Sequence, residues 1–221
     1  MILNFTDLKR TGKFISIVVV LSFMAVLNIH TKFETMTFGT YNGQPIEWEI
    51  FEKLNDNSYI LVTKDCIDYR EFNGTSNLWE GSELRTWLNS DFLMEFTDEE
   101  KSRIKRVTNE VILAYNDRGL AVSGDHPHYC NYTKKNVDDL SKTAYHYYLD
   151  DVVYIPTLDM MQTIDVNDNY WILCPYTNND KMQRYMNNDG FILRTNVTNK
   201  RGVRAVVKYS LGSNESVPHA E

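Results

Sequence analysis

The sequence predicts an α+β fold of mostly antiparallel sheet with two or three packed helices, preceded by an N-terminal apolar helix. Short segments rich in β-branched and aromatic residues alternate with turn residues over most of the chain. A central stretch instead repeats its apolar residues at helical spacing between capping residues. An uncharged apolar run lies near the start. With 43% hydrophobic and 24% charged residues among 221, the chain has enough apolar side chains to form a core.

The apolar run extends from Phe14 to Ile29 and follows the basic residues Lys9, Arg10 and Lys13. A basic flank before an apolar run is typical of a signal peptide or a signal-anchor. As a helix the run would span about 24 Å at 1.5 Å per residue, slightly less than a hydrocarbon core of about 30 Å. Three interpretations stay open: an uncleaved anchor, which we favour, a cleaved secretory signal, and a buried globular helix.

This segment determines the expected organisation and location of the protein. Residues 1–31 form the basic flank and apolar segment, residues 33–210 a single α+β domain, and residues 211–221 a polar tail. We expect a single-pass membrane protein that contacts the bilayer through residues 14–29, with its N-terminus inside and its domain outside. Signal cleavage would instead release a secreted domain. The net charge of −7 excludes a typical nucleic-acid-binding protein, which needs a basic surface.

The domain begins with three predicted strands. Residues 33–42 are rich in β-branched and aromatic side chains and end in an Asn-Gly turn. Residues 46–51 alternate apolar and acidic side chains, which predicts a strand with one buried face. A second polar turn leads into residues 59–63, so that these two strands form a hairpin.

Two helices are predicted after these strands. Ser82 can cap the first helix, in which Leu84, Trp87 and Leu88 recur at i, i+3 and i+4 and therefore share one face. The second helix opens with the capping-box pattern Thr-Asp-Glu-Glu that starts at Thr97.

The second half of the domain is predicted as short strands and turns. We expect strands at residues 107–114, 152–155 and 171–173, a short helix at 156–161, a hairpin that joins 185–186 to 191–193 through Gly190, and a last strand at 203–210 after Gly202. Residues 115–135 are polar and contain glycine and proline, which predicts a loop.

Several motifs together resemble a bacterial domain family of unknown function that occurs in secreted and surface proteins. The motifs are FGTY (38–41), IEWEIF (46–51), WEGSELRTWLNSDF (79–92), FTDEEKSRI (96–104), DDVVYIPTLDM (150–160), YWILCP (170–175) and GVRAVV (202–207). The family hallmarks are an opening FGxY and IEW, a central LRxWLN, and a closing WWLRSP and GVRPAL. The resemblance covers about residues 36–211 and implies that the domain is exported.

The chain departs from the family pattern near its end. Leu173 and Cys174 replace an Arg-Ser pair, and Ala205 replaces a proline. Any binding role of that Arg-Ser pair would therefore be lost in this chain. The closing motifs are also distantly similar to C-type-lectin-like folds, including sulfatase-modifying enzymes. This similarity concerns the fold and by itself implies no function.

Two groups of residues carry candidate metal or thiol chemistry. His126, His128 and Cys130 alternate in sequence, and imidazole and thiolate are ligands that Zn²⁺ prefers. A proline between the histidines and nearby glycines favour a solvated loop instead, so we predict no bound metal and no cofactor. Cys66, Cys130 and Cys174 allow one disulfide in any of three pairings, and three separate thiols are an equal alternative.

Tryptophan and arginine residues are expected to serve mainly the structure. Three tryptophans lie on apolar faces of predicted elements and are expected in the core: Trp48, Trp87 and Trp171. Trp79 lies beside glycines in a predicted loop and is the candidate for an exposed ligand platform. Arg85 and Arg204 lie within packed motifs, where we expect them to pair with acidic side chains or to bond to loop carbonyls.

The sequence favours a binding module over an enzyme. It has no nucleophile elbow, phosphate-binding loop or dinucleotide fingerprint. We expect a non-catalytic surface for a glycan or protein ligand, built from the loops 73–81 and 115–135 and the polar segment 178–184. The candidate ligand-binding residues are Trp79, Asn178, Asn179 and Arg184. The alternative is an enzyme related to the sulfatase-modifying oxidases.

Overall fold

The computed structural model describes residues 34–112, 146–158, 160, 164, 167–176 and 179–211. All of them belong to the compact unit that begins at Phe33. The predicted membrane segment Phe14–Ile29 and nearly all of the predicted polar tail lie outside these residues. Within the described ranges, no helix combines the length and the hydropathy needed to cross a bilayer.

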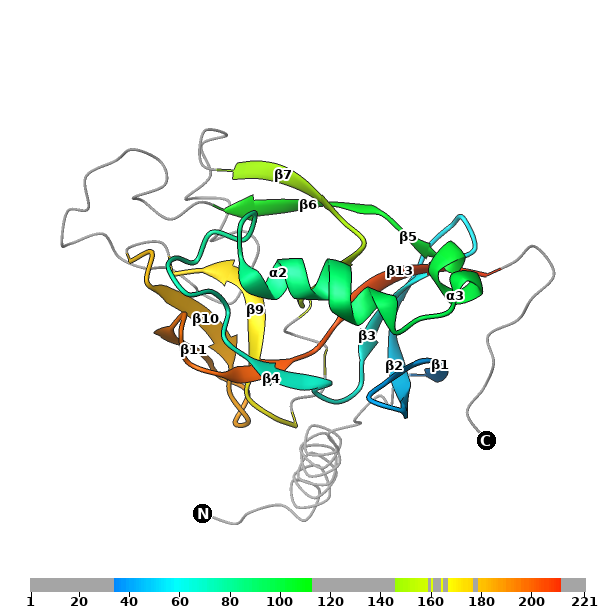
Figure 1. The fold of residues 1–221 in the computed structure, drawn as a ribbon, viewed down its shortest axis with the longest axis horizontal. Helices are drawn as coiled ribbons and strands as arrows, with labels where there is room; N and C mark the ends of the chain where they lie inside the picture. Colours follow the sequence, from blue (N-terminus) through cyan, green and yellow to red (C-terminus); the bar gives the residue numbers. More distant parts are fainter. Residues whose placement is uncertain are drawn as a thin grey trace, which may run out of the picture. The chain divides into compact units, whose positions relative to one another are not determined.

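Two mostly antiparallel sheets and a two-stranded ribbon make up the described fold (Figure 1). Sheet A has the order β1 (Thr35–Tyr41), β2 (Gln44–Lys53), β3 (Ser58–Thr63), β13 (Val206–Ser210) and β5 (Ile104–Lys105), with β8 (Val153–Tyr154) also paired to β13. Sheet B has the order β11 (Ile192–Asn196), β10 (Met182–Met186), β9 (Tyr170–Pro175), β12 (Arg201–Val203) and β4 (Asp68–Arg70). The ribbon, sheet C, pairs β6 (Val107–Ile112) with β7 (His146–Asp151).

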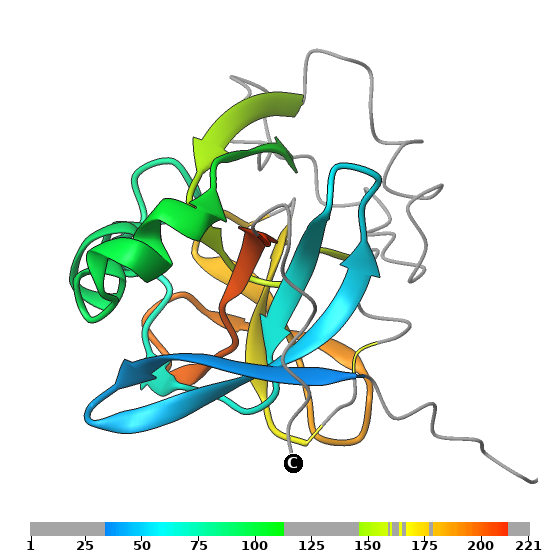
Figure 2. The same cartoon turned by 90° about the vertical axis from the view of Figure 1, so that its right-hand side faces the viewer.

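The three predicted N-terminal strands are confirmed. Ile46 and Trp48 on β2 are 5% and 0% exposed, as the alternating pattern predicts for a buried face. Asn42 and Gly43 both have positive φ and close the tight turn between β1 and β2. In Figure 2, β3 lies between β2 and β13, which agrees with the pairing of all five residues of β13 with β3.

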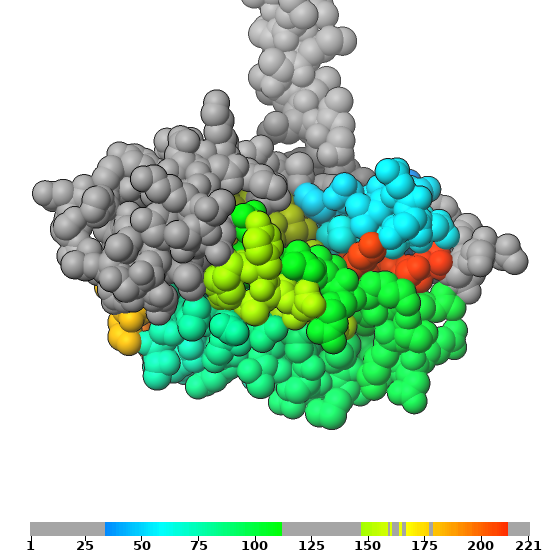
Figure 3. Space-filling model, turned by 90° about the horizontal axis from the view of Figure 1, so that it is seen from above, coloured from blue at the N-terminus to red at the C-terminus, as the bar shows by residue number. Residues whose placement is uncertain are grey.

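Both predicted helices are confirmed, and the first is extended by a wide turn. Ser82 caps α2 (Glu83–Trp87), which continues directly into the π-helical turn η1 (Leu88–Phe92). Leu84, Trp87 and Leu88 are 1%, 6% and 0% exposed, so their shared face is buried as predicted. The capping box of α3 (Asp98–Arg103) is formed between Thr97 and Glu100. In the space-filling view of Figure 3, this helical region and β7 lie side by side on one face.

The prediction of one last strand at 203–210 is wrong, because the chain changes sheets there. β12 belongs to sheet B and β13 to sheet A. The five residues from Val203 to Val207 are all 0% exposed. A single strand alternates its side chains between two faces, whereas this segment passes through the core between two sheets and is buried on every side.

Two other predicted elements are present. The short helix predicted at 156–161 is 3₁₀-helical at Leu158 and Met160, where the Met160 amide donates to the carbonyl oxygen of Thr157 at 3.2 Å. Thr157 also forms a parallel bridge with Leu173 of β9. The predicted hairpin at 185–193 is confirmed, with Gly190 at φ +82° in its turn.

Candidate functional site

The central LRxW motif is held by one buried carboxylate. Asp151, at the end of β7, accepts hydrogen bonds from Arg85 Nε at 2.6 Å, Trp79 Nε1 at 3.0 Å and Asn109 Nδ2 at 2.9 Å. The side chain of Asp151 is fully buried. We call these four residues the Asp151 cluster. It joins the loop before α2, the helix itself and both strands of sheet C, and it pairs Arg85 with an acidic side chain.

Arg204 forms a second buried ion pair between the sheets. Its Nη2 donates to Glu49 Oε2 at 2.7 Å, and its Nε donates to the Thr63 carbonyl oxygen at 2.6 Å. The arginine is fully buried, and the glutamate is 5% exposed. The guanidinium also lies over the Tyr170 ring, 5.3 Å from its centroid. Arg204 therefore pairs with an acidic side chain inside the fold.

The expectation that Trp79 is exposed is wrong. Its side chain is 1% exposed, its indole NH donates to Asp151, and its ring contacts Phe72 at a centroid distance of 5.8 Å. The glycines around it shape the loop, but the tryptophan itself turns inward because the buried carboxylate supplies a partner for its polar end. Trp48, Trp87 and Trp171 are buried as predicted. None of the four tryptophans can act as a surface platform in this conformation.

Two of the three loops of the predicted binding surface do lie together. Asn77 Nδ2 donates to the carbonyl oxygens of Tyr176 at 3.1 Å and Met182 at 2.7 Å, which joins the 73–81 loop to the start of β10. Asn179 is exposed, whereas Arg184 is only 7% exposed. Asn178 and the third loop, 115–135, lie outside the described residues.

The described cysteines provide no reactive thiol pair. Cys66 and Cys174 are both free thiols, so the predicted pairing of these two is absent, and Cys130 lies outside the described residues. Burial raises the pKa of the Cys66 thiol to about 12, so it stays protonated at neutral pH. A Cβ at Gly202 would collide with its sulfur and would lie 2.9 Å from the Asn169 carbonyl oxygen, which explains the glycine in the closing motif. Cys174 is 4% exposed in β9.

The metal prediction falls mostly outside the structure. His126, His128 and Cys130 are not among the described residues. In the ranges that are described, no group of three or more His, Cys, Asp or Glu side chains is arranged to hold a metal ion.

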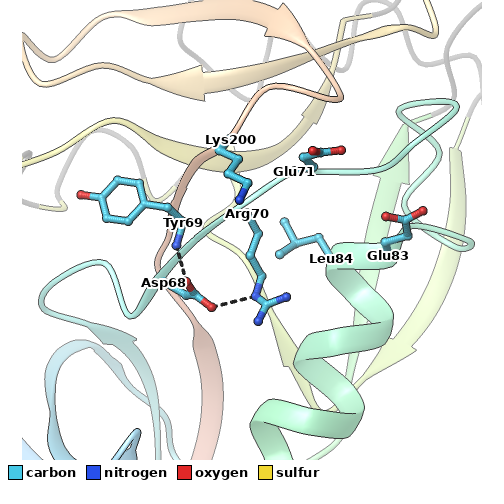
Figure 4. Close-up of a pocket in the computed structure, with 7 residues that line it drawn as sticks. All are labelled: Asp68, Tyr69, Arg70, Glu71, Glu83, Leu84 and Lys200. Atoms are coloured by element: carbon cyan, nitrogen blue, oxygen red, sulfur yellow. Dashed lines mark hydrogen bonds and ion pairs between the residues drawn. The ribbon is translucent and has the colours of Figure 1, made fainter.

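The polar pocket with the clearest chemistry lies between β4 and the start of α2 (Figure 4). Its volume is about 410 Å³. We call it the β4 pocket, and its lining consists of Asp68, Tyr69, Arg70, Glu71, Glu83, Leu84 and Lys200. Figure 4 shows Arg70, Glu71, Leu84 and Lys200 around its centre, whereas the Tyr69 ring points away from Leu84 and Glu83.

Arg70 is held in place from both sides. Its Nε donates to Asp68 Oδ2 at 2.9 Å, and the same oxygen accepts the Tyr41 hydroxyl at 2.9 Å. Its guanidinium carbon lies 3.9 Å from the centroid of the Trp87 ring. The Arg70 carbonyl oxygen also accepts the indole NH of Trp171 at 2.8 Å. A planar cation stacked on a buried ring in this way is oriented before any ligand arrives.

The other charges of the β4 pocket have no partner among the described residues. Glu71, Glu83 and Lys200 form no ion pair there, whereas the Arg70 guanidinium, besides its pair with Asp68, interacts with the Tyr41 hydroxyl. The pocket therefore presents two carboxylates that can accept hydrogen bonds and two cationic groups that can donate them, and the buried Leu84 forms part of its wall. This set suits a ligand rich in hydroxyl groups.

Sequence reasoning missed this pocket because β4 was not predicted as a strand. The run Asp68-Tyr69-Arg70-Glu71 carries three charges and an aromatic ring shortly before the central motif. This concentration of charged residues was the feature of the sequence that could have indicated a polar site. The charges come together with Lys200 only through the pairing of β4 with β12, where Arg70 stands opposite Arg201. Such long-range register cannot be read from local pattern.

Fold and pocket together define an α+β domain of two larger sheets and a two-stranded ribbon, with an open polar site. The chain belongs to the family described as a domain of unknown function, DUF6273, whose model matches residues 56–208. The matched region begins in the turn before β3 and ends within β13, and it contains both the β4 pocket and the Asp151 cluster. No curated protein matches the chain. No solved structure matches it either, so the likeness to C-type-lectin-like folds stays a prediction.

Proposed function

We propose that this protein is an exported, membrane-tethered binding module that holds a glycan in the β4 pocket. The observation that carries the proposal is the set of charged groups around that pocket that lack described partners. Carboxylates accept hydrogen bonds from sugar hydroxyls, and guanidinium and ammonium groups donate to their oxygens. This site replaces the surface predicted around Trp79.

Charge favours a neutral ligand over an acidic one. Asp68 and Arg70 form an ion pair with each other at 2.9 Å, which leaves Glu71 and Glu83 against Lys200. The remaining balance is one negative charge, and the net charge of the whole chain is −7. The excess negative charge of the pocket and the negative net charge of the chain would both repel an acidic glycan. A protein ligand is the second class that the same surface could accept, and the experiment below separates the two.

Export is supported by the sequence alone. The basic residues Lys9, Arg10 and Lys13 precede the apolar run Phe14–Ile29, an order that retains the N-terminus inside and places the following domain outside. That location would place the β4 pocket among the polysaccharides of the cell surface. The oxidase alternative finds no support in the described thiols, since the half-buried Cys66 thiol stays protonated at neutral pH.

The proposal is tested by screening the detergent-solubilised full-length protein on a glycan array and a protein array. For a glycan that binds, Glu83→Gln and Lys200→Gln should each weaken the affinity tenfold or more. Hydrogen bonds to charged groups contribute about 1.5–3 kcal/mol, which corresponds to that factor. The matched control is Glu95→Gln, an exposed carboxylate on the same helical region that does not line the pocket.

The outcomes discriminate between the alternatives. Equal glycan affinity in all three variants and the wild type would show that the β4 pocket is not the site. A partner found only on the protein array, and lost in the Glu83 and Lys200 variants, would replace the glycan by a protein ligand at the same site.

A further inference from the structure

A second group of charges lies on the β10–β11 hairpin, away from the lining of the β4 pocket. Arg184 of β10 and Arg194 of β11 stand directly opposite each other in the antiparallel register. Directly opposed residues project from the same face of a sheet. Both guanidinium groups lie beside the ring of Tyr176, with their central carbons 5.3 Å and 4.6 Å from its centroid. We call these two residues the arginine pair.

The arginine pair has no counter-charge in the described part of the chain. The only hydrogen bond of the Arg184 side chain there runs from Nε to the Pro175 carbonyl oxygen at 3.4 Å, and neither arginine forms an ion pair there. Arg184 is nevertheless only 7% exposed. Burial of a charge without a partner is costly, and like charges directly across a sheet destabilise it.

The arrangement contrasts with the other arginines of the fold. Arg85 and Arg204 are each paired with a carboxylate, at 2.6 Å and 2.7 Å. Arg201 stacks alone on Tyr185, at 4.5 Å from the ring centroid, and bonds to the Lys200 carbonyl oxygen. Tyr185 follows Arg184 in β10, so its side chain projects from the opposite face of the hairpin. In contrast, the arginine pair brings two stacked guanidinium groups together, and no carboxylate among the described residues pairs with either of them.

We propose that the arginine pair binds a tetrahedral dianion, the phosphate or sulfate group of a ligand. Guanidinium groups donate parallel hydrogen bonds to oxyanions, and stacking on Tyr176 fixes their planes in advance. Two positive charges are balanced by a dianion and only half balanced by a single carboxylate. In an acidic protein the anion would be drawn to this hairpin and not to the β4 pocket.

The test measures thermal stabilisation of the full-length protein by inorganic phosphate, inorganic sulfate and acetate at constant ionic strength. Wild type, Arg194→Gln, Arg194→Lys and the control Arg201→Gln are compared. Phosphate and sulfate also stabilise proteins in general by exclusion from the surface, and that effect is common to all variants. The site-specific part is the difference between variants, and titration calorimetry with phosphate gives the affinity.

We expect phosphate and sulfate to raise the midpoint of wild type and of Arg201→Gln more than acetate does. Arg194→Gln should weaken phosphate binding tenfold or more, and Arg194→Lys should recover only part of it because lysine lacks the planar fork. Equal phosphate affinity in Arg194→Gln and wild type overturns the site. Acetate as effective as phosphate overturns the assignment to a dianion. Stabilisation lost equally in Arg201→Gln shows a general charge effect and also overturns the site.

Discussion

Asp151 is the single acceptor on which Arg85, Trp79 and Asn109 converge, and it has no contact with solvent. We expect Asp151→Asn to lower the free energy of unfolding by about 3–5 kcal/mol, because the amide keeps only one acceptor oxygen, turns an NH2 group toward buried donors and removes the negative charge that pairs with Arg85. Urea denaturation measures the loss. Asp150→Asn is the control, since that carboxylate is bonded to Thr108 at an exposed position and should cost about 1 kcal/mol or less. Equal losses in both variants would contradict the role of the cluster.

Trp87 joins the helix to both the core and the β4 pocket. It is 6% exposed, contacts Phe92 at a centroid distance of 5.6 Å, and supports the guanidinium of Arg70. Trp87→Ala should therefore cost about 3–5 kcal/mol, the usual range for a large buried aromatic residue. Met94→Ala, at a side chain that is 67% exposed, should change stability by about 0.5 kcal/mol or less. A loss below about 1 kcal/mol for Trp87→Ala would mean that the helix is not anchored through this ring.

At the scale of elements, the capping box of α3 does more than cap a helix. Glu100 accepts the Thr97 amide at 2.8 Å and also the amide of Gly39 in β1 at 2.8 Å. Gly39 has φ +71°, and a Cβ there would collide with the Phe96 ring. The FGxY motif and the α3 motif are thus two halves of one contact between the first strand and the last helix.

This contact predicts a pH dependence. Burial alone would raise the pKa of Glu100, but hydrogen bonds from Thr97 and Gly39 outweigh burial and bring it below its ordinary value of 4.5. A carboxyl with a lowered pKa stabilises the fold above its unfolded pKa, and this contribution is lost as the pH falls through its folded pKa. Glu100→Gln should therefore be less stable than wild type at pH 7, and the difference should shrink below about pH 5.

The measurement is a series of thermal or urea transitions between pH 7 and pH 3. Glu99→Gln serves as the control, because Glu99 lies in the same turn but forms only an exposed pair with Arg103, worth about 0.5 kcal/mol or less. A difference between Glu100→Gln and wild type that stays constant over this range would contradict the linkage.

The sequence predicted those elements whose determining residues lie within a few positions of one another. The β2–β3 hairpin, the Ser82 cap and the α3 capping box follow from alternation and capping residues near each other in sequence. The switch of the chain from β12 to β13 was not predictable, because five consecutive buried residues look like one buried strand. The β4 pocket depends on the same long-range pairing. Trp79 was misplaced because its partner, Asp151, lies 72 residues away.

For the whole molecule, the proposed topology can be tested directly. We expect protease added to intact cells to digest the domain that follows Phe14–Ile29, and the protein to remain with membranes after an alkaline wash. Replacing Lys9, Arg10 and Lys13 by glutamate should reduce export, since the basic flank orients the segment. A cytoplasmic enzyme of the same cells is the control for intactness. Full protection of the domain would contradict export, and release into the medium would support signal cleavage.

The position of β13 bears on the order in which the protein can fold. This strand forms hydrogen bonds with β3, β5 and β8, yet it is the last described strand to leave the ribosome. Until β13 is synthesised, the edge of β3 that pairs with it has no hydrogen-bonding partner strand. The ion pair of Arg204 with Glu49 is also missing at that stage. Contacts between residues so far apart in sequence close slowly. A nascent chain therefore cannot complete sheet A before its last described strand has been made, so we expect the sheet to close only after synthesis of the domain.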